Sequence, residues 1–418
     1  MSELTASAGH ASSDHAADQG DTGMPAVLVF EAQAIGMIGV IRSLGRAGYC
    51  VHAAASRVDA PGLHSRFCRH SALHPSYQSG DFLLWLQHYV QHHAIAAIVP
   101  SEAFLLAIEP VYERYHPLLP DAADAAILYR SFGKSDVQES FSASMDPQLQ
   151  QHLPRAIVVR RGEPHLAADR VAQWQWPLYV KTDGRHADRD QVAGVRAVTE
   201  PEQLSAALST ALHSHNRCQV QETVPGVKAT VNLWRHRGEF RAASMCVAMH
   251  ENPHTGGLTA YRRIWWHEAM FADAKRRLQA LEWQGVAMVE YKWDEATGKF
   301  WFLELNTRYW NALNLDLLAG KDFPRWQLDA FFGRALVQDL APGPLGFRAR
   351  YTVPADVGYL MSRCRDPKVT PLRKWWALIE FVWLALNPAV HSDLWFKGDR
   401  GLYWRAWTRF LRQLGRSE

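Results

Sequence analysis

Short apolar runs alternate with helix-like stretches in the first third of the chain. Ala26–Phe30 is continuously apolar, which is typical of a strand buried on both faces. Gly36–Gly48 predicts a helix that ends at a glycine, and Tyr49–Ala55 predicts the next strand. A second helix is expected at Asp81–His93 and another buried strand at Ala94–Pro100. These βαβ units predict a Rossmann-like layer with a parallel sheet over residues 25–125.

The middle of the chain predicts an antiparallel sheet. A helix is expected first, at Ser131–Ser144, and a later one at Asp273–Leu281. Apolar or alternating stretches between them predict the strands Ala156–Val159, Pro177–Thr182, Gln219–Val224, Thr230–Trp234 and Phe240–Met249.

The stretch Val286–Leu315 predicts a hairpin whose turn is Asp294–Gly298. Folding it about Thr297 places Glu290 opposite Glu304 on a largely apolar face, with Asn306 one step along. Two facing carboxylates repel each other there unless a cation lies between them. A divalent ion with oxygen ligands would supply that charge, and so would a Lys or Arg from elsewhere. The hairpin alone does not decide between them.

Length and composition narrow the class of protein. A chain of 418 residues predicts two to four domains, and a net charge of +3 is too small to argue for nucleic acid. The five cysteines are scattered, which indicates reduced thiols and a cytoplasmic protein. Residues 1–24 lack the apolar core of a signal peptide and predict a disordered tail.

Several kinds of chemistry are disfavoured by their missing motifs. Phe30–Gln33 stands where a glycine-rich dinucleotide loop would follow the first strand, so nicotinamide binding is not expected. No motif for covalent catalysis is found. His250 and His254 have the spacing of helix-borne metal ligands, but they fall in a Pro- and Gly-containing loop, which disfavours a metal site.

The chain from Arg350 onward is more basic and richer in tryptophan than the rest. It holds twelve Lys and Arg against six Asp and Glu, and six of the 17 tryptophans. In Gly401–Arg416, Tyr403, Trp407, Phe410 and Leu414 recur at helical spacing, and Arg405, Arg409, Arg412 and Arg416 recur on another face. We favour a helix that packs on its own domain. The alternative is a basic amphipathic helix that contacts a membrane surface or a partner protein through residues 370–416.

The order of these features resembles one superfamily. A Rossmann-like layer is followed by Gly133-Lys134, Val180-Lys181, the QETVPG of Gln221–Gly226 and the VEYK…FLELNTR of Val289–Arg308. This layout is similar to that of the ATP-grasp enzymes, specifically their carboxylate–amine ligase-like members. The resemblance covers roughly Val27 to Gly333, and the hairpin is its most specific part. It implies an α/β fold in which a Rossmann-like domain precedes a two-lobed ATP-grasp domain.

The resemblance also implies domain boundaries. The Rossmann-like domain would span 25–125 and the ATP-grasp domain 126–342, with a covering lobe at about 155–224. Residues 343–418 would form a C-terminal helical extension rich in aromatic and basic residues.

The implied roles centre on ATP and Mg²⁺, with Mn²⁺ as a substitute. Glu290, Glu304 and Asn306 match the metal ligands, and Arg308 matches the arginine that steadies the transferred phosphoryl group. Further residues match nucleotide contacts: Lys134 and Lys181 at the phosphates, and Gln221, Glu222 and Val224 along the adenine edge. Loop Asp183–Gly194 matches the flexible cover over the phosphates.

Three positions depart from the family pattern. Lys228 stands where the family often has an acidic residue that holds the ribose hydroxyls, and a lysine cannot accept those hydrogen bonds. The covering loop has few glycines and contains Arg185 and Arg189, which suggests that arginine clamps the phosphates. Gly133 replaces an aspartate that is common before the first lysine.

The expected chemistry activates a substrate carboxylate as an acyl phosphate, which an amine or another nucleophile then attacks. The alternatives are carboxylation or phosphoryl transfer by an enzyme of the same superfamily, and an ATP-binding protein without catalysis. The substrates would be small molecules, with candidate pocket linings at Pro100–Glu102, Gly256-Gly257, Arg262 and Tyr309–Asn311. Neither the acid, the amine nor the oligomeric state follows from the sequence.

Overall fold

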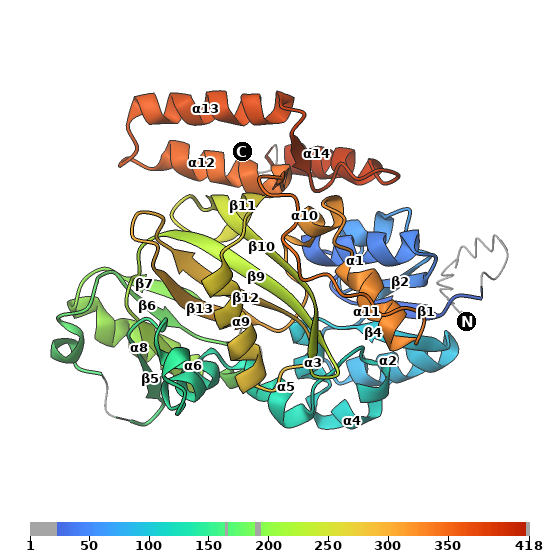
Figure 1. Ribbon diagram of the computed structural model, residues 1–418, viewed down its shortest axis with the longest axis horizontal. Coiled ribbons are helices and arrows are strands. Elements are labelled where there is room, and N and C mark those ends of the chain that lie inside the picture. The colour runs from blue at the N-terminus through green and yellow to red at the C-terminus, as the bar shows by residue number, and fades with distance from the viewer. Residues whose placement is uncertain (1–22, 164–165, 189–193, 415–418) are drawn as a thin grey trace, which may run out of the picture.

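The computed structural model describes residues 23–163, 166–188 and 194–414. Its described strands form three sheets, and helices cover them (Figure 1). Most of the expected N-terminal tail lies outside the described residues. The mixed α/β fold class predicted from the sequence is confirmed.

The N-terminal domain is a four-stranded parallel sheet with the strand order β3-β2-β1-β4. Burial of nearly all of β1 and β2 explains why their sequences are almost entirely apolar, with His52 as the exception. Its strands are β1 (Ala26–Val29), β2 (Cys50–Ala55), β3 (His70–Leu73) and β4 (Ile95–Val99). Its helices are α1 (Ile35–Arg46), α2 (Asp81–His92), α3 (Glu102–Ala107), α4 (Tyr112–Tyr115) and α5 (Ala125–Phe132).

The segment expected to form the covering lobe contains a four-stranded antiparallel sheet with the order β5-β8-β6-β7. It consists of β5 (Ala156–Arg160), β6 (Leu178–Lys181), β7 (Val195–Val198), β8 (Arg217–Gln221) and α8 (Glu202–Ser214). Two helices precede it, α6 (Lys134–Ser142) and α7 (Pro147–Gln150). The lobe has a hydrophobic core of its own, which includes Leu178, Leu208 and Val220.

The largest sheet has seven strands in the order β13-β12-β9-β10-β11-β14-β15. Its long strands are β9 (Val227–His236), β10 (Glu239–Asn252), β11 (Leu258–Ile264), β12 (Gly285–Trp293) and β13 (Phe300–Asn306). The helices α9 (Glu268–Ala280), α10 (Leu313–Leu318) and α11 (Phe323–Phe331) accompany it. Its core is continuous with that of the N-terminal domain, because Leu28 and Phe30 belong to the same cluster as Val231 and Phe302.

The C-terminal part holds three α-helices among its described residues, and it also extends the large sheet. Two short strands, β14 (Arg348–Arg350) and β15 (Val390–Ser392), form its outer edge. The helices are α12 (Val357–Arg365), α13 (Pro371–Leu386) and α14 (Gly401–Leu414), which lie along one side of the molecule (Figure 1). Leu402 of α14 is buried against Ile35 and Ile38 of α1, so this helix packs on the N-terminal domain.

Two sequence predictions are corrected near the site. The single helix expected at Ser131–Ser144 is divided, because Gly133 is extended and separates α5 from α6. A Cβ atom at Gly133 would lie 2.1 Å from the carboxylate of Asp136, so any side chain at this position would have to displace that carboxylate. The strand expected at Gln219–Val224 ends at Gln221, and the residues after it form the connection to β9.

Candidate functional site

The hairpin of β12 and β13 has the register predicted from the sequence. Glu290 pairs with Glu304 across the two strands, and Asn306 pairs with Met288. A bulge follows Glu290, because the next pair joins Tyr291 to Phe302. Glu290 is 8% exposed, so its carboxylate lies in a place where charge needs a partner.

A lysine forms an ion pair with each of the two facing carboxylates. Lys134 Nζ lies 3.0 Å from Glu304 Oε2, and Lys228 Nζ lies 3.5 Å from Glu290 Oε2. Burial disfavours the charged form of Glu304, but Lys134 and Lys181 outweigh it and lower its pKa to about 2. For Glu290 burial prevails and raises the pKa, although Lys228 opposes it. The lysines therefore supply the cationic charge that the facing carboxylates require.

Lys181 is the most deeply desolvated of these lysines. It ends β6, and its Nζ donates a 2.8 Å hydrogen bond to Gln221 Oε1 at the end of β8. Burial lowers the pKa of Lys181 to about 8, with Glu304 opposing and Lys134 adding to the shift. A buried ammonium whose one described side-chain acceptor is a neutral amide is suited to receive an anion.

Asn306 and Arg308 complete the end of the hairpin. Asn306 Nδ2 lies 3.2 Å from Glu290 Oε1 and 3.4 Å from Glu304 Oε1, so the amide joins both carboxylates. Its Oδ1 accepts a 3.2 Å hydrogen bond from Arg308 Nη2. Arg308 also approaches Glu102 of the N-terminal domain, with Nε 3.9 Å from Oε2. The arginine thus lies where the hairpin meets the first domain.

No protein-family model and no curated protein sequence matches this chain. Solved structures do match it over most of its length. The biotin carboxylase of Campylobacter jejuni, solved as a β-γ-ATP complex, has a TM-score of 0.61 and 13% identity, covering 78% of this chain and 74% of that chain. The N5-carboxyaminoimidazole synthetase of Staphylococcus aureus has a TM-score of 0.55 and 13% identity, covering 76% and 80%.

A third similar structure is a ligase by name. The L-amino acid ligase of Bacillus licheniformis has a TM-score of 0.54 and 14% identity, covering 73% of this chain and 74% of that chain. These carboxylases, synthetases and ligases share one architecture. The chain has the ATP-grasp fold. Identities this low establish the ATP-grasp fold and leave the reaction open.

Lys228 is held in place by the large sheet of the ATP-grasp fold. Its Nζ lies 3.1 Å from Glu251 Oε1 and donates a 2.7 Å hydrogen bond to the carbonyl of Gly257. Burial opposes the charge, but Glu290 and Glu251 outweigh it and raise the pKa of Lys228. Lys292, opposite Lys228 on the next strand, lies 3.9 Å from Glu251 Oε2. Sequence reasoning missed Glu251, because its approach to Lys228 depends on how strands β9 and β10 pair.

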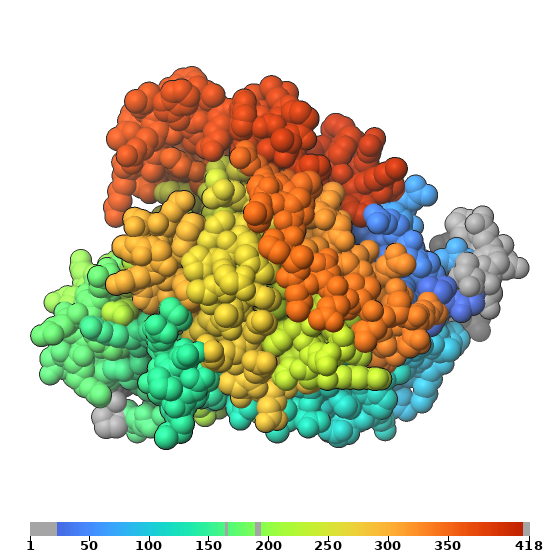
Figure 2. All heavy atoms as spheres, viewed as in Figure 1, coloured from blue at the N-terminus to red at the C-terminus, as the bar shows by residue number. Residues whose placement is uncertain are grey.

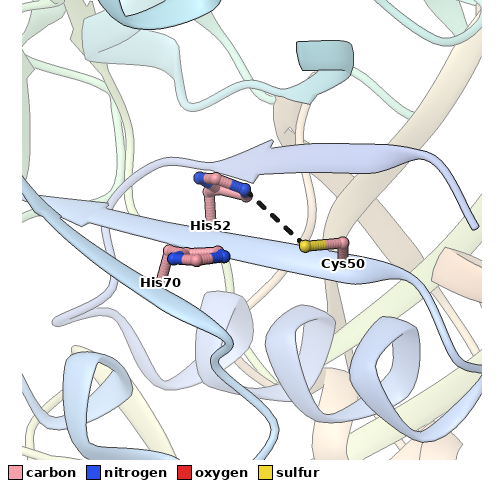
Figure 3. A group of neighbouring side chains, drawn as sticks. All are labelled: Cys50, His52 and His70. Carbon is pink, nitrogen blue, oxygen red and sulfur yellow. Dashed lines mark hydrogen bonds between the residues drawn. The ribbon is translucent and has the colours of Figure 1, made fainter. Parts of the chain in front are cut away.

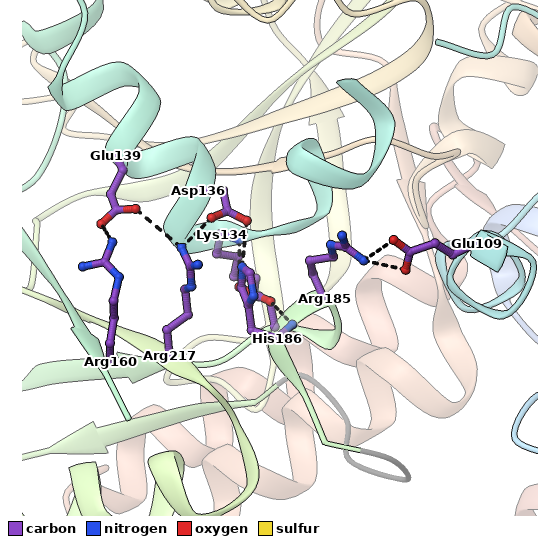
Figure 4. Close-up of polar contacts among 9 residues, drawn as sticks. Glu109, Lys134, Asp136, Glu139, Arg160, Arg185, His186 and Arg217 are labelled. Atoms are coloured by element: carbon purple, nitrogen blue, oxygen red, sulfur yellow. Dashed lines mark hydrogen bonds and ion pairs between the residues drawn. The ribbon is translucent and has the colours of Figure 1, made fainter. Parts of the chain in front are cut away.

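The beginning of the covering loop is fastened to the body of the protein (Figure 4). Asp183 accepts hydrogen bonds from the backbone N–H groups of Lys134 (2.9 Å) and His186 (3.0 Å). His186 Nε2 lies 2.7 Å from Asp136 Oδ2. Arg185 contacts Glu109 at 2.5 Å and lies over the Tyr129 ring. In this structure Arg185 is thus held by Glu109, its contact with phosphate stays a prediction, and Arg189 lies outside the described residues.

The connection after β8 is shaped by hydrogen bonds to neighbouring segments. The backbone N–H of Glu222 donates to the Arg155 carbonyl, and its Oε1 accepts from the Arg155 N–H, both at 3.1 Å. Val224 lines a cavity of about 470 Å³ between this connection and the hairpin turn. The charged side chains of the hairpin site do not line that cavity, so it is separate from the charged part of the site: Lys134, Lys181, Lys228, Glu290 and Glu304 are all absent from its lining.

The candidate substrate linings separate into two groups. Glu102 faces Arg308, and Gly257 contacts Lys228, so both lie at the charged cluster. Arg262 is buried and pairs with Asp393 at 2.7 Å, while Trp310 is fully buried and donates to Asp316 at 2.6 Å. These last two residues are therefore packed and paired inside the protein, which corrects the expectation that they are pocket linings.

A second group of ligand-type side chains lies apart from the hairpin, at the edge of the N-terminal sheet (Figure 3). One ligand atom from each of Cys50, His52 and His70 lies within 4.8 Å of the others, a set that could hold a soft cation. The rings of His52 and His70 are stacked at 4.4 Å, and His52 Nδ1 lies 2.9 Å from Tyr89 Oη. These contacts account for the arrangement of the three side chains by packing.

His250, which has the spacing of a metal ligand in the sequence, pairs with Asp356 at 2.8 Å.

Proposed function

We propose that this protein is an ATP- and Mg²⁺-dependent ligase that activates a substrate carboxylate as an acyl phosphate for attack by an amine. The observation that carries the proposal is the charge pattern of the hairpin. Glu290 and Glu304 lie opposite each other, and the cationic groups of Lys134, Lys228 and Arg308 surround them. Such a cluster can exchange its internal ion pairs for a nucleotide phosphate and its metal.

The residues present fit a hard divalent cation. Glu290 and Glu304 offer carboxylate oxygens, and Asn306 offers an amide oxygen, which are the donors that Mg²⁺ prefers. When bound, the metal would neutralise charge on the phosphates. Asn306 now turns its nitrogen toward the carboxylates and its oxygen toward Arg308, so its amide would have to rotate to act as a ligand. Lys134 and Lys228 would then be released toward the phosphates and neighbouring groups.

The proposed reaction needs positioning more than covalent catalysis. A carboxylate oxygen of the substrate attacks the γ-phosphorus of ATP, the bond to the bridging oxygen breaks, and ADP leaves. The amine nitrogen attacks the acyl carbon, phosphate departs with the C–O electron pair, and the nitrogen loses a proton to solvent. Lys181 and Lys134 would hold phosphate oxygens, and Arg308 would stabilise the charge that develops on the transferred group.

Carboxylation is the second candidate, because a biotin carboxylase and an N5-carboxyaminoimidazole synthetase share the fold. In that case bicarbonate would take the place of the substrate carboxylate, and the first product would be carboxyphosphate. Both candidates use the same residues for the nucleotide. They differ in the acid that is activated.

The experiment is a turnover assay with ATP and Mg²⁺ over a panel of amino acids and other small acids and amines, with and without bicarbonate. The proposal predicts that ADP and phosphate appear in equal amounts only with the right acid and amine, and that hydroxylamine traps the acyl group as a hydroxamate. Strict dependence on bicarbonate would establish carboxylation instead. A phosphorylated product without free phosphate would overturn both. Glu295→Gln, in the exposed turn, is the matched control for Glu304→Gln.

A further inference from the structure

The helix α13 leaves an unusually apolar surface in contact with solvent. Of its 16 residues only Ala377 and Leu384 are buried. Three tryptophans are largely exposed: Trp375 (66%), Trp376 (61%) and Trp383 (54%). The other exposed apolar side chains of this helix are Leu372, Leu378, Ile379, Val382 and Leu386. Contiguous apolar surface of this extent marks a contact with a protein or a membrane.

The inner side of α13 is anchored, which fixes the direction of its apolar side chains. Arg350 Nη1 donates a 3.2 Å hydrogen bond to the carbonyl of Phe381, and its guanidinium lies 4.1 Å from that ring. Glu380 Oε1 lies 3.4 Å from His250 Nε2 of the large sheet. Figure 1 shows α13 as the outermost layer above α12, and Figure 2 shows this layer projecting from the body. The tryptophans therefore face away from the protein.

Acidic and basic side chains are distributed differently around this helix. Each acidic side chain that the structure describes between 350 and 414 has a partner inside the protein. The pairs are Asp356 with Arg350, Asp366 with His254, Glu380 with His250, Asp393 with Arg262 and Asp399 with Arg42. Exposed cations in the same region are Arg365, Lys368, Arg373, Lys397, Arg400, Arg405 and Arg412. Among these acids only Glu380 is exposed, at 45% of its side chain, so the exposed charge of the described residues in this region is predominantly positive.

The neighbouring helix α14 adds to the same character. Trp404 is 60% exposed and Leu411 is 59% exposed, beside the exposed Arg405 and Arg412. We infer that the face formed by α13 and α14 docks on the surface of an anionic lipid bilayer, with its tryptophans at the level of the headgroups. Tryptophan is enriched at that level, and arginine and lysine are attracted to anionic lipids.

The same observations favour a surface contact over the alternatives. None of the described helices is long and apolar enough to cross a membrane. With 16 residues, α13 is roughly 24 Å long, short of the roughly 30 Å hydrocarbon core. A partner protein or a second copy would cover the apolar side chains equally well, but the excess of exposed cations over exposed carboxylates in this region fits an anionic surface better.

The test is co-sedimentation of the full chain with vesicles of phosphatidylcholine, alone or with phosphatidylglycerol. We expect binding to the anionic vesicles, weaker binding to the neutral ones, and a blue shift of the tryptophan fluorescence. Replacing Trp375, Trp376 and Trp383 by serine should lower the partition coefficient at least about tenfold. The matched control replaces three exposed apolar residues of the N-terminal domain, Val58, Leu73 and Leu84, by serine and should bind as the natural chain does.

A second variant tests the electrostatic part. Arg365→Glu, Lys368→Glu and Arg373→Glu together should abolish the preference for phosphatidylglycerol and leave the binding to neutral vesicles unchanged. The inference is overturned if the natural chain binds no vesicles, or if the tryptophan variant binds them equally well. It is also overturned if light scattering shows a dimer that the tryptophan substitutions dissociate while vesicle binding is absent, because a second copy would then cover the face.

Discussion

Glu290 and Glu304 are direct cross-strand partners, and the two carboxylates are stabilised by lysines from different parts of the chain. Lys134 reaches Glu304 from the start of α6, and Lys228 reaches Glu290 from β9. Two elements far apart in the sequence therefore converge on one hairpin. The proposed exchange of these lysines for a metal–nucleotide complex leads to the following predictions.

The stability of the protein should depend on Lys181 between about pH 8 and 10.5. Its pKa is lowered to about 8 by burial, whereas the unfolded chain keeps the proton up to about 10.5. In that window the unfolded state binds more protons, so the free energy of unfolding contributed by this group rises with pH. Lys181→Met should remove this rise and stabilise the protein at pH 7 by up to about 3 kcal/mol.

Urea unfolding at several pH values gives the free energy of unfolding of the natural protein and of Lys181→Met. The difference between the two values isolates Lys181, because the other titrating groups contribute equally to both. Lys299→Met, at an exposed position of the hairpin turn, is the control. Equal pH dependence in the natural protein and Lys181→Met would show that Lys181 is not desolvated.

Removing Lys228 should leave Glu290 and Glu251 without their shared cation. Lys228→Met is expected to lower the free energy of unfolding at pH 7 by about 3 kcal/mol, because it breaks a largely buried ion pair. The loss should shrink as the pH falls below 7, because burial raises the pKa of Glu290 and favours its protonated form. Chemical unfolding of both proteins over a series of pH values measures this change. Lys292→Met, which only approaches Glu251 at 3.9 Å, should have a small effect.

Gly226 should resist substitution for steric reasons. Its φ is +105°, and a Cβ atom there would lie 2.2 Å from the carbonyl oxygen of Trp293. Gly238 also has a positive φ, +83°, but a Cβ atom there would have nothing within 4 Å. Gly226→Ala should therefore destabilise the protein by at least about 2 kcal/mol more than Gly238→Ala in thermal or urea unfolding. Similar losses in both would mean that the connection after β8 can move away from β12.

The sequence predicts the parts of this structure that depend on local patterns. Alternation along Lys299–Asn306 and a short turn are enough to give the Glu290–Glu304 register, because side chains on a strand repeat every two residues. The continuous apolar strands of the N-terminal domain follow from their burial on both faces. The sequence pattern places Gly133 inside a helix. Nothing in the local sequence shows that the Asp136 carboxylate would lie where a side chain at position 133 would begin.

Local sequence patterns do not predict which acidic residues pair with the lysines and arginines near the site. That Lys228 meets Glu251, that Arg185 meets Glu109, and that Arg262 is used by Asp393 all depend on contacts between elements distant in the chain. The apolar periodicity of α14 was visible in the sequence. The exposed apolar surface of α13 was not, because a short run of Trp, Leu and Ile is equally compatible with a buried helix.

The central claim is that the hairpin carboxylates receive a metal–nucleotide complex. Calorimetric titration with a non-hydrolysable ATP analogue, with and without Mg²⁺, tests it most directly on the natural protein, Glu304→Gln and the control Glu295→Gln. We predict that Mg²⁺ tightens binding at least about tenfold in the natural protein and the control, and that Glu304→Gln loses this enhancement while remaining folded. An unchanged enhancement in Glu304→Gln, or no binding by the natural protein, would contradict the account.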